Sequence, residues 1–166
     1  MRNLGSKIAI AAVIGLGAVA ANAAPVTAEA GAGAKIIAPL EIASTTDLYF
    51  GTIAPSLTEA GDVVVTPDGA KTCAAALTCL TSDHTAAAFE VRGESDIVYT
   101  ISLPGKIDIT SNKGDTMFVR DFSGSKSEGR LNKGKDDFTV GGTLDVGVRQ
   151  AAGLYTGRFV VAVEYQ

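Results

Sequence analysis

A two-residue alternation of apolar and polar side chains recurs along this chain at intervals of about ten residues. Successive side chains of a β-strand point to opposite faces, so each such segment fits a strand with one buried face. Many short strands at this spacing are typical of a sandwich or barrel. The alternation predicts an all-β protein with strands over residues 35–42, 47–53, 62–66, 71–81, 87–93, 96–103, 116–122, 138–148 and 156–165.

Turn-forming residues separate these segments, and they favour antiparallel pairing. No segment after residue 23 has a sustained 3.6-residue apolar repeat, so almost no helix is expected, with at most one helical turn near residues 74–77. Gly141 and Gly142 lie inside a long predicted strand, where they indicate a bulge or bend. The turn signals are Pro67-Asp68-Gly69, Ser111-Asn112-Lys113-Gly114 and Asn132-Lys133-Gly134.

The first residues have the layout of a secretory signal peptide. Arg2 and Lys7 supply positive charge, residues 8–20 form an apolar run, and Ala21-Asn22-Ala23 provides the small residues of a cleavage site. The run is shorter than the roughly 20 residues that a permanent membrane helix needs. We therefore expect cleavage after Ala23, no membrane span afterwards, and export to the periplasm or cell surface of a Gram-negative bacterium.

The rest of the chain is expected to contain a flexible extension, residues 24–34, and one sandwich domain, residues 35–166. Loss of Arg2 and Lys7 leaves 12 basic residues against 18 acidic ones, a net charge of −6. That balance argues against nucleic acid as a partner. Trp is absent, so the chain has little material for an aromatic sugar-binding platform.

Cys73 and Cys79 are the only cysteines, and an even number of cysteines in an exported chain predicts a disulfide. The ring that this bond closes is small, so it would fix one turn. A redox role would require Cys-x-x-Cys spacing or a strongly basic environment. The chain has no Cys-x-x-Cys spacing, and the basic environment of its cysteines is limited to Lys71.

The residues that could perform catalysis are few. His84 is the single histidine and is expected to be exposed in a polar loop, where its neighbours cannot form a triad with it. Asp136 and Asp137 could in principle act as paired carboxylates, but adjacent residues at the start of a strand point to opposite sides. They are interpreted as solvated turn residues. No metal-ligand spacing is present, so we expect no enzyme activity, no metal and no cofactor.

Basic residues cluster between positions 126 and 135, interleaved with Ser, Glu and Asp. This composition is typical of a solvated hairpin tip. The residues concerned are Lys126, Arg130, Lys133 and Lys135.

Six short sequence phrases stand out along the chain: Ile37-Ala38-Pro39-Leu40, residues 47–53 (DLYFGTI), 89–93 (FEVRG), 99–104 (YTISLP), 138–144 (FTVGGTL) and 152–159 (AGLYTGRF). Together they resemble the bacterial family called domain of unknown function 4402. They occur in the family's order over nearly all of the chain after the signal peptide. The resemblance implies an exported, antiparallel, immunoglobulin-like sandwich, and it supplies no catalytic or binding residues.

The chain has a short apolar-alternating N-terminal segment, a Leu-x-Phe-Gly strand at residues 48–51 and a C-terminal Tyr-x-Gly-x-Phe strand at residues 155–159. This layout is similar to that of spore coat U type proteins and chaperone-usher pilins. In such pilins a neighbour's N-terminal strand completes an incomplete sandwich, with a periplasmic chaperone and an outer-membrane usher as partners. The chain departs from pilins in placing its cysteine pair within one short loop. The resemblance implies a fimbrial-type subunit that associates with itself or related subunits, with Ile36, Ala38, Leu40 and Ile42 as the candidate strand-exchange face.

Two other interpretations remain open. Residues 35–42 could simply be the first strand of the chain's own domain. The protein could also be a monomeric periplasmic or surface binding module that uses loops at one end of the sandwich, such as residues 72–85 and 122–135.

Overall fold

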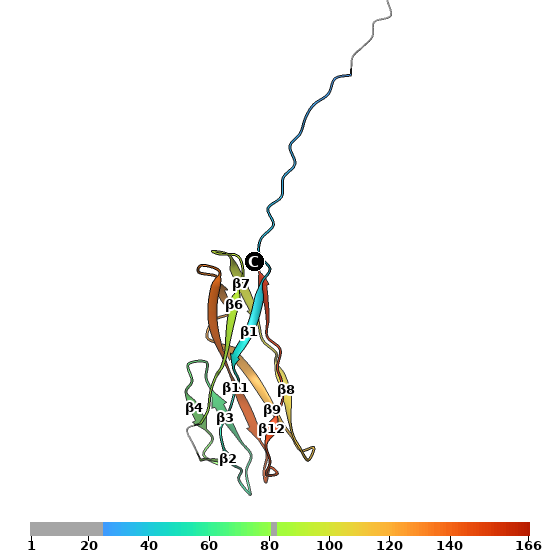
Figure 1. Ribbon diagram of the computed structural model, residues 1–166. Coiled ribbons are helices and arrows are strands. Elements are labelled where there is room, and N and C mark those ends of the chain that lie inside the picture. Colours follow the sequence, from blue (N-terminus) through green and yellow to red (C-terminus); the bar gives the residue numbers. More distant parts are fainter. Residues whose placement is uncertain (1–24, 81–82) are drawn as a thin grey trace, which may run out of the picture. The chain divides into compact units, whose positions relative to one another are not determined.

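The computed structural model describes residues 25–80 and 83–166, so the predicted signal peptide lies outside the described residues. Ile36–Gln166 forms one compact unit. Residues 25–35 run as an extended chain without helix or strand (Figure 1), and their side chains are exposed.

The described residues contain strands and turns but no helix, and hence no helix that could cross a membrane. The strands are β1 (Glu41–Thr46), β2 (Ile53–Ala54), β3 (Gly61–Val65), β4 (Lys71–Cys73), β5 (Thr78–Cys79), β6 (Ala87–Arg92), β7 (Val98–Ser102), β8 (Lys106–Ser111), β9 (Thr116–Gly124), β10 (Glu128–Arg130), β11 (Lys135–Val146), β12 (Tyr155–Thr156) and β13 (Ala162–Tyr165).

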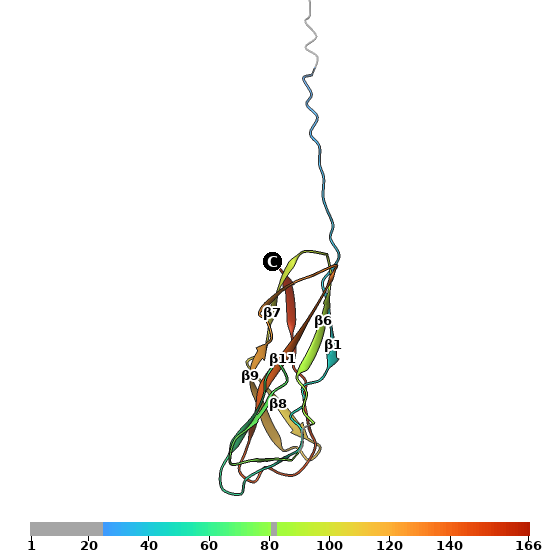
Figure 2. The ribbon, with the colours of Figure 1, turned by 90° about the vertical axis from the view of Figure 1, so that its left-hand side faces the viewer.

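The strands pair antiparallel in two main sheets. The larger sheet has the order β1-β6-β11-β9-β8-β12, with β3 beside β11 and β4 beside β3. The smaller sheet has the order β10-β7-β13, and β2 pairs with β5. Figure 2 shows β1 and β6 on one side of the compact unit and β7 on the other. The prediction of a single all-β, antiparallel sandwich domain is confirmed.

Apolar side chains between the layers form two core clusters. The lower cluster, near β2 and β3 in Figure 1, includes Val63, Val65 and Leu144. The upper cluster, near β6 and β7, includes Val91 and Tyr99. Leu48 and Phe122 pack against both clusters, so the core is continuous along the sandwich. The upper cluster also holds Phe89, Leu131, Phe138 and Val140, with the Phe89 and Phe138 rings stacked 5.2 Å apart.

The expected bulge lies where Gly141 and Gly142 face β9. Between Gly141 and Thr143 the pairing register shifts, and β9 carries the extra residue. Asp121 takes a positive φ of 50° there. A Cβ on Gly141 would come within 2.2 Å of the Val65 carbonyl oxygen, so only glycine allows this close approach.

The predicted disulfide is confirmed between Cys73 and Cys79, whose Cα atoms are 6.5 Å apart. Between them the chain turns, with the Leu77 N–H donating to the Ala74 carbonyl oxygen. The segment predicted as one strand, residues 71–81, is therefore two short strands, β4 and β5, with Thr81 outside the described residues. All three predicted turns are present, with positive φ at Gly69, Gly114 and Gly134.

The first strand begins at Glu41 instead of Lys35. Glu41 pairs with Arg92, the last residue of β6, so the residues that precede Glu41 have no neighbouring strand to pair with. The prediction for residues 35–42 is therefore wrong in position. Residues 47–53 are likewise not one strand, because they contribute only a bridge at Tyr49 and the start of β2.

The C-terminal segment changes partners along its length. β12 pairs with β8, whereas β13 pairs with β7. At its start the Tyr155 hydroxyl donates to the carbonyl oxygen of Ala151, 2.7 Å away. This backward hydrogen bond resembles that of the tyrosine corner in immunoglobulin-like sandwiches.

Candidate functional site

One long side of the sandwich is left open between β1 and β13. Strand β1 pairs only with β6, and β13 pairs only with β7, so in the described residues neither has a partner on its other edge. We call this line the open seam. Its upper end is where β1 begins and β13 ends, and its lower end is near β12 (Figure 1).

Apolar side chains line the open seam from both sides. Leu40 and Ile42 belong to the β1 side, and Phe159, Val161 and Val163 belong to the C-terminal side. All five pack against the upper core cluster but remain only half-buried. The seam therefore combines an unpaired backbone edge with an incompletely covered part of the core.

The outer edge of β13 presents backbone groups at alternate residues. The Gln166 N–H donates to the Val98 carbonyl oxygen, which identifies the positions whose backbone faces β7. In an antiparallel ladder these positions alternate, so Val163 and Tyr165 direct their N–H and C=O groups away from β7. No backbone partner for these groups occurs among the described residues.

Tyr165 closes the seam at its upper end. Its hydroxyl donates to the Ala38 carbonyl oxygen, 3.0 Å away, and accepts the Glu94 N–H at 2.8 Å. The hydroxyl thus holds the chain that leads into β1 against the end of β13.

The candidate strand-exchange face is divided by this arrangement. Ile36 is 93% exposed and Ala38 is also exposed. Leu40 and Ile42, in contrast, pack against the chain's own core. The four side chains therefore do not share one environment.

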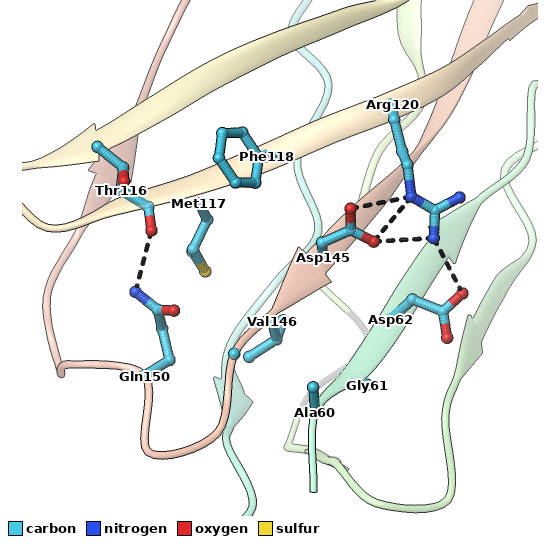
Figure 3. Close-up of a pocket in the computed structure, with 11 residues that line it drawn as sticks. Ala60, Gly61, Asp62, Thr116, Met117, Phe118, Arg120, Asp145, Val146 and Gln150 are labelled. Atoms are coloured by element: carbon cyan, nitrogen blue, oxygen red, sulfur yellow. Dashed lines mark hydrogen bonds and ion pairs between the residues drawn. The ribbon is translucent and has the colours of Figure 1, made fainter.

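A shallow hollow of about 410 Å³ lies on the outer face of the larger sheet (Figure 3). Arg120 of β9 dominates it, and its Nε is 2.9 Å from both carboxylate oxygens of Asp145 on β11. The same guanidinium pairs with Asp121 and lies 3.9 Å from Asp62 Oδ2 on β3. These hydrogen bonds, with Asp145 first, raise the pKa of Arg120.

The other features of the hollow do not supply a reactive centre. Phe118 is 38% exposed, but the Lys106 ammonium already lies over its ring, 3.4 Å from the centroid. The donors of Arg120 are likewise directed at carboxylates. The hollow is therefore best explained as an ion-paired surface that joins β3, β9 and β11.

A partly buried polar cluster lies beneath β10. The hydroxyl of Tyr99, which is fully buried, donates to Asp136 Oδ2 at 3.0 Å, and the Lys126 ammonium lies 2.8 Å from Oδ1. Burial raises the pKa of Tyr99, and the bond to Asp136 adds to this rise. Burial alone would raise the pKa of Asp136, but hydrogen bonds from Lys126, Tyr99 and the Asp137 N–H lower it overall.

This cluster corrects two interpretations made from the sequence. Asp136 and Asp137 do point to different sides, but the Asp136 side chain is only 19% exposed and is not a solvated turn residue. Lys126 is half-buried against it, so the basic residues do not all form a solvated tip. The alternation within residues 135–140 could have indicated this, because Asp136 has the parity of Phe138 and Val140.

His84 is half-buried and not exposed as expected. Its Nε2 lies 3.0 Å from the Gly69 carbonyl oxygen, while Nδ1 is buried without a hydrogen-bond partner in the part of the chain that the structure describes. Within the same part, no group of three or more His, Cys, Asp or Glu side chains could hold a metal ion.

The structure is an antiparallel β-sandwich in which the outer edges of β1 and β13 are unpaired within the described residues. A family model described as "Domain of unknown function (DUF4402)" matches residues 40–165, and the chain belongs to this family. Comparisons with curated proteins and with solved structures found no match.

Proposed function

We propose that this protein is an exported structural or surface subunit of fimbrial type, which associates with itself or related subunits by strand complementation. The observation that carries the proposal is the open seam. Its unpaired backbone edge and its half-buried apolar side chains are the two things that an added strand covers at once.

The edge of β13 lacks the features with which sandwich proteins usually protect an edge. Such edges carry a proline, an inward-pointing charge or a covering loop. Residues 160–166 contain no proline, and Glu164, the charged residue among them, is exposed on the outer side. An edge of this kind favours pairing with another chain.

The proposal includes a location and partners. The signal-like N-terminus, the disulfide and the strand edge suit the periplasm or cell surface of a Gram-negative bacterium. A periplasmic chaperone would cover the seam before assembly, and an outer-membrane usher would receive the subunits. The proposed mechanism needs no cofactor, catalytic residue or nucleic acid.

The alternative of a monomeric binding module has less support. The two loops suggested for it belong to opposite ends of the sandwich, because β4 and β5 lie at the lower end while the turn at Lys133 lies beside Gly93 at the upper end (Figure 1). The loops therefore cannot form one joint binding surface.

The test is to shear cells, to collect the released and periplasmic fractions, and to run them on a denaturing gel with and without boiling. Strand-complemented polymers should give a ladder that collapses to one monomer band on heating. A single monomer band in both lanes would contradict the proposal and favour a self-complete binding module.

The matched variant is Val161→Pro. Val161 has the parity of Val163, so its N–H faces the open seam, whereas the ladder to β7 uses the backbone of Ala162 and Glu164. We expect the variant to fold, as shown by an unfolding curve in urea, and to lose the ladder. A folded variant that retains the full ladder would show that assembly does not use this edge.

A further inference from the structure

An alternating segment that no strand of the sandwich uses precedes β1. From Val26 to Ala32 every even residue is apolar and small, and the odd residues are Thr27, Glu29 and Gly31. All these side chains are exposed in the structure. The even residues are Val26, Ala28, Ala30 and Ala32.

The edge that lines the open seam has a matching pattern. From Tyr155 to Val163 the odd residues are half-buried, apart from Gly157, and the even residues are exposed. The half-buried side chains include the large ring of Phe159. A strand with small apolar side chains on one face suits an edge whose inward side chains are already large.

The upper end of the seam is occupied by the chain's own backbone, because Tyr165 holds Ala38 there. In a second copy, the C-terminal end of the donated strand is attached to that copy's own sandwich. This end must therefore lie at the lower end of the seam. Since residues 155–163 run from the lower end to the upper end, the incoming strand runs antiparallel to them.

The charges fix the register of this antiparallel pair. Glu29 is the one charge in the alternating segment, and Arg158 is an exposed charge on the edge, with no ion-pair partner among the described residues. Placing Glu29 opposite Arg158 sets Val26 opposite Val161, Ala28 opposite Phe159 and Ala32 opposite Tyr155. A register shifted by six residues would instead place Glu29 opposite Glu164, where like charges repel.

Building on the proposed function, we infer that the donated strand is residues 26–32 of a second copy, antiparallel to residues 155–161, with Glu29 beside Arg158. Each copy then accepts a strand at its lower end and donates its own segment onward. Such a head-to-tail contact does not close on itself and generates a filament.

Leu40 and Ile42 do not take part as donors, because they remain in their own core. The candidate strand-exchange face thus moves towards the N-terminus. Residues 33–37 become the connection between the donated strand and its own sandwich.

Cysteine pairing on the exposed face tests both the segment and its direction. In the inferred register Thr27 lies opposite Val160, whereas a parallel strand with the same Glu29–Arg158 contact would place Thr27 opposite Thr156. Chains carrying T27C are mixed during assembly with chains carrying either V160C or T156C, and a mild oxidant is added. We expect a disulfide-linked dimer with V160C and at least five-fold less with T156C.

A charge exchange provides a second readout. E29R should lower the polymer fraction about five-fold, because two positive charges then face each other across the strand pair. E29R combined with R158E should restore the polymer fraction, because the exchanged charges attract again. The control is E164K, which changes an exposed charge that this register does not use, and it should leave the polymer fraction unchanged.

The outcomes separate the two proposals. If the unaltered protein forms no polymer, strand complementation itself is wrong. If it does form polymers, but T27C links to T156C or to neither site, or the charge exchange does not restore assembly, complementation stands and the inferred donor or direction is overturned. A T27C/V160C double variant that links within one monomer would show that the segment fills its own seam, which also overturns the inference.

Discussion

Replacing Asp136 by Asn tests the polar cluster under β10. The carboxylate receives the Tyr99 hydroxyl at 3.0 Å, the Lys126 ammonium at 2.8 Å and the Asp137 N–H at 2.9 Å. Asn offers one acceptor oxygen in place of two and carries no charge. A hydrogen bond to a charged group contributes about 1.5–3 kcal/mol. We therefore expect D136N to lower the free energy of unfolding by about 2–3 kcal/mol at pH 7.

The stability difference between the unaltered protein and D136N should depend on pH. The pKa of Asp136 in the folded protein is lowered from its ordinary value of 3.8, so folding favours the ionised form. The stabilisation is complete above the pKa of the unfolded chain and disappears as the pH falls through the lower, folded value. The stability difference between the two proteins should thus be constant from pH 7 to about pH 5 and shrink below about pH 4.

Urea unfolding, followed by circular dichroism at pH 7, 5, 4 and 3, measures this difference. The control is D137N, because Asp137 is an exposed neighbour on the same strand and should change stability by less than about 0.5 kcal/mol. Equal losses for the two variants at pH 7, or a D136N loss that grows as the pH falls, would refute the role assigned to the cluster.

Two further substitutions examine other parts of the fold. A Cβ on Gly129 would lie 2.6 Å from the Tyr99 hydroxyl oxygen, so G129A should cost about 1–3 kcal/mol in thermal or urea unfolding, while G105A, which meets nothing within 4 Å, should be close to neutral. A G129A protein as stable as G105A would contradict the packing described for β10. Replacing Cys73 and Cys79 by Ala opens a small ring and should lower the free energy of unfolding by about 2 kcal/mol. An unchanged urea midpoint would contradict this expected loss of stability.

Alternation predicted most strands because it reports directly which side chains face the core. The glycines at positions 141 and 142 predicted the bulge, since glycine inside a strand marks a close backbone approach. Alternation failed at the first strand, where Ile36 has the same parity as Leu40 but lies beyond the end of β6. Alternation shows which face of a strand can be buried, but it cannot show where the neighbouring strand ends.

The polar cluster could not be predicted from the sequence for a different reason. Lys126, Asp136 and Tyr99 come from three separate segments, and each alone resembles an ordinary surface or core residue. Their meeting depends on pairing between β7 and β10. The short strand β10 was itself missed because Gly129 interrupts its apolar pattern. The strand β8 was also missed, although Ile107 and Ile109 alternate within it.

The C-terminal segment that joins β8 through β12 and β7 through β13 has a consequence for the rate of folding. Strand β1 pairs with β6 about fifty positions away along the chain, as Glu41 with Arg92, and Tyr155 pairs with Ser111. Few of these pairings can form locally, so contact order is high, and folding is expected on the millisecond-to-second scale of β-sandwiches. During that interval an incompletely folded chain exposes unpaired strands to its neighbours, so the crowding of such chains, as well as the stability of the finished sandwich, limits the yield of folded protein.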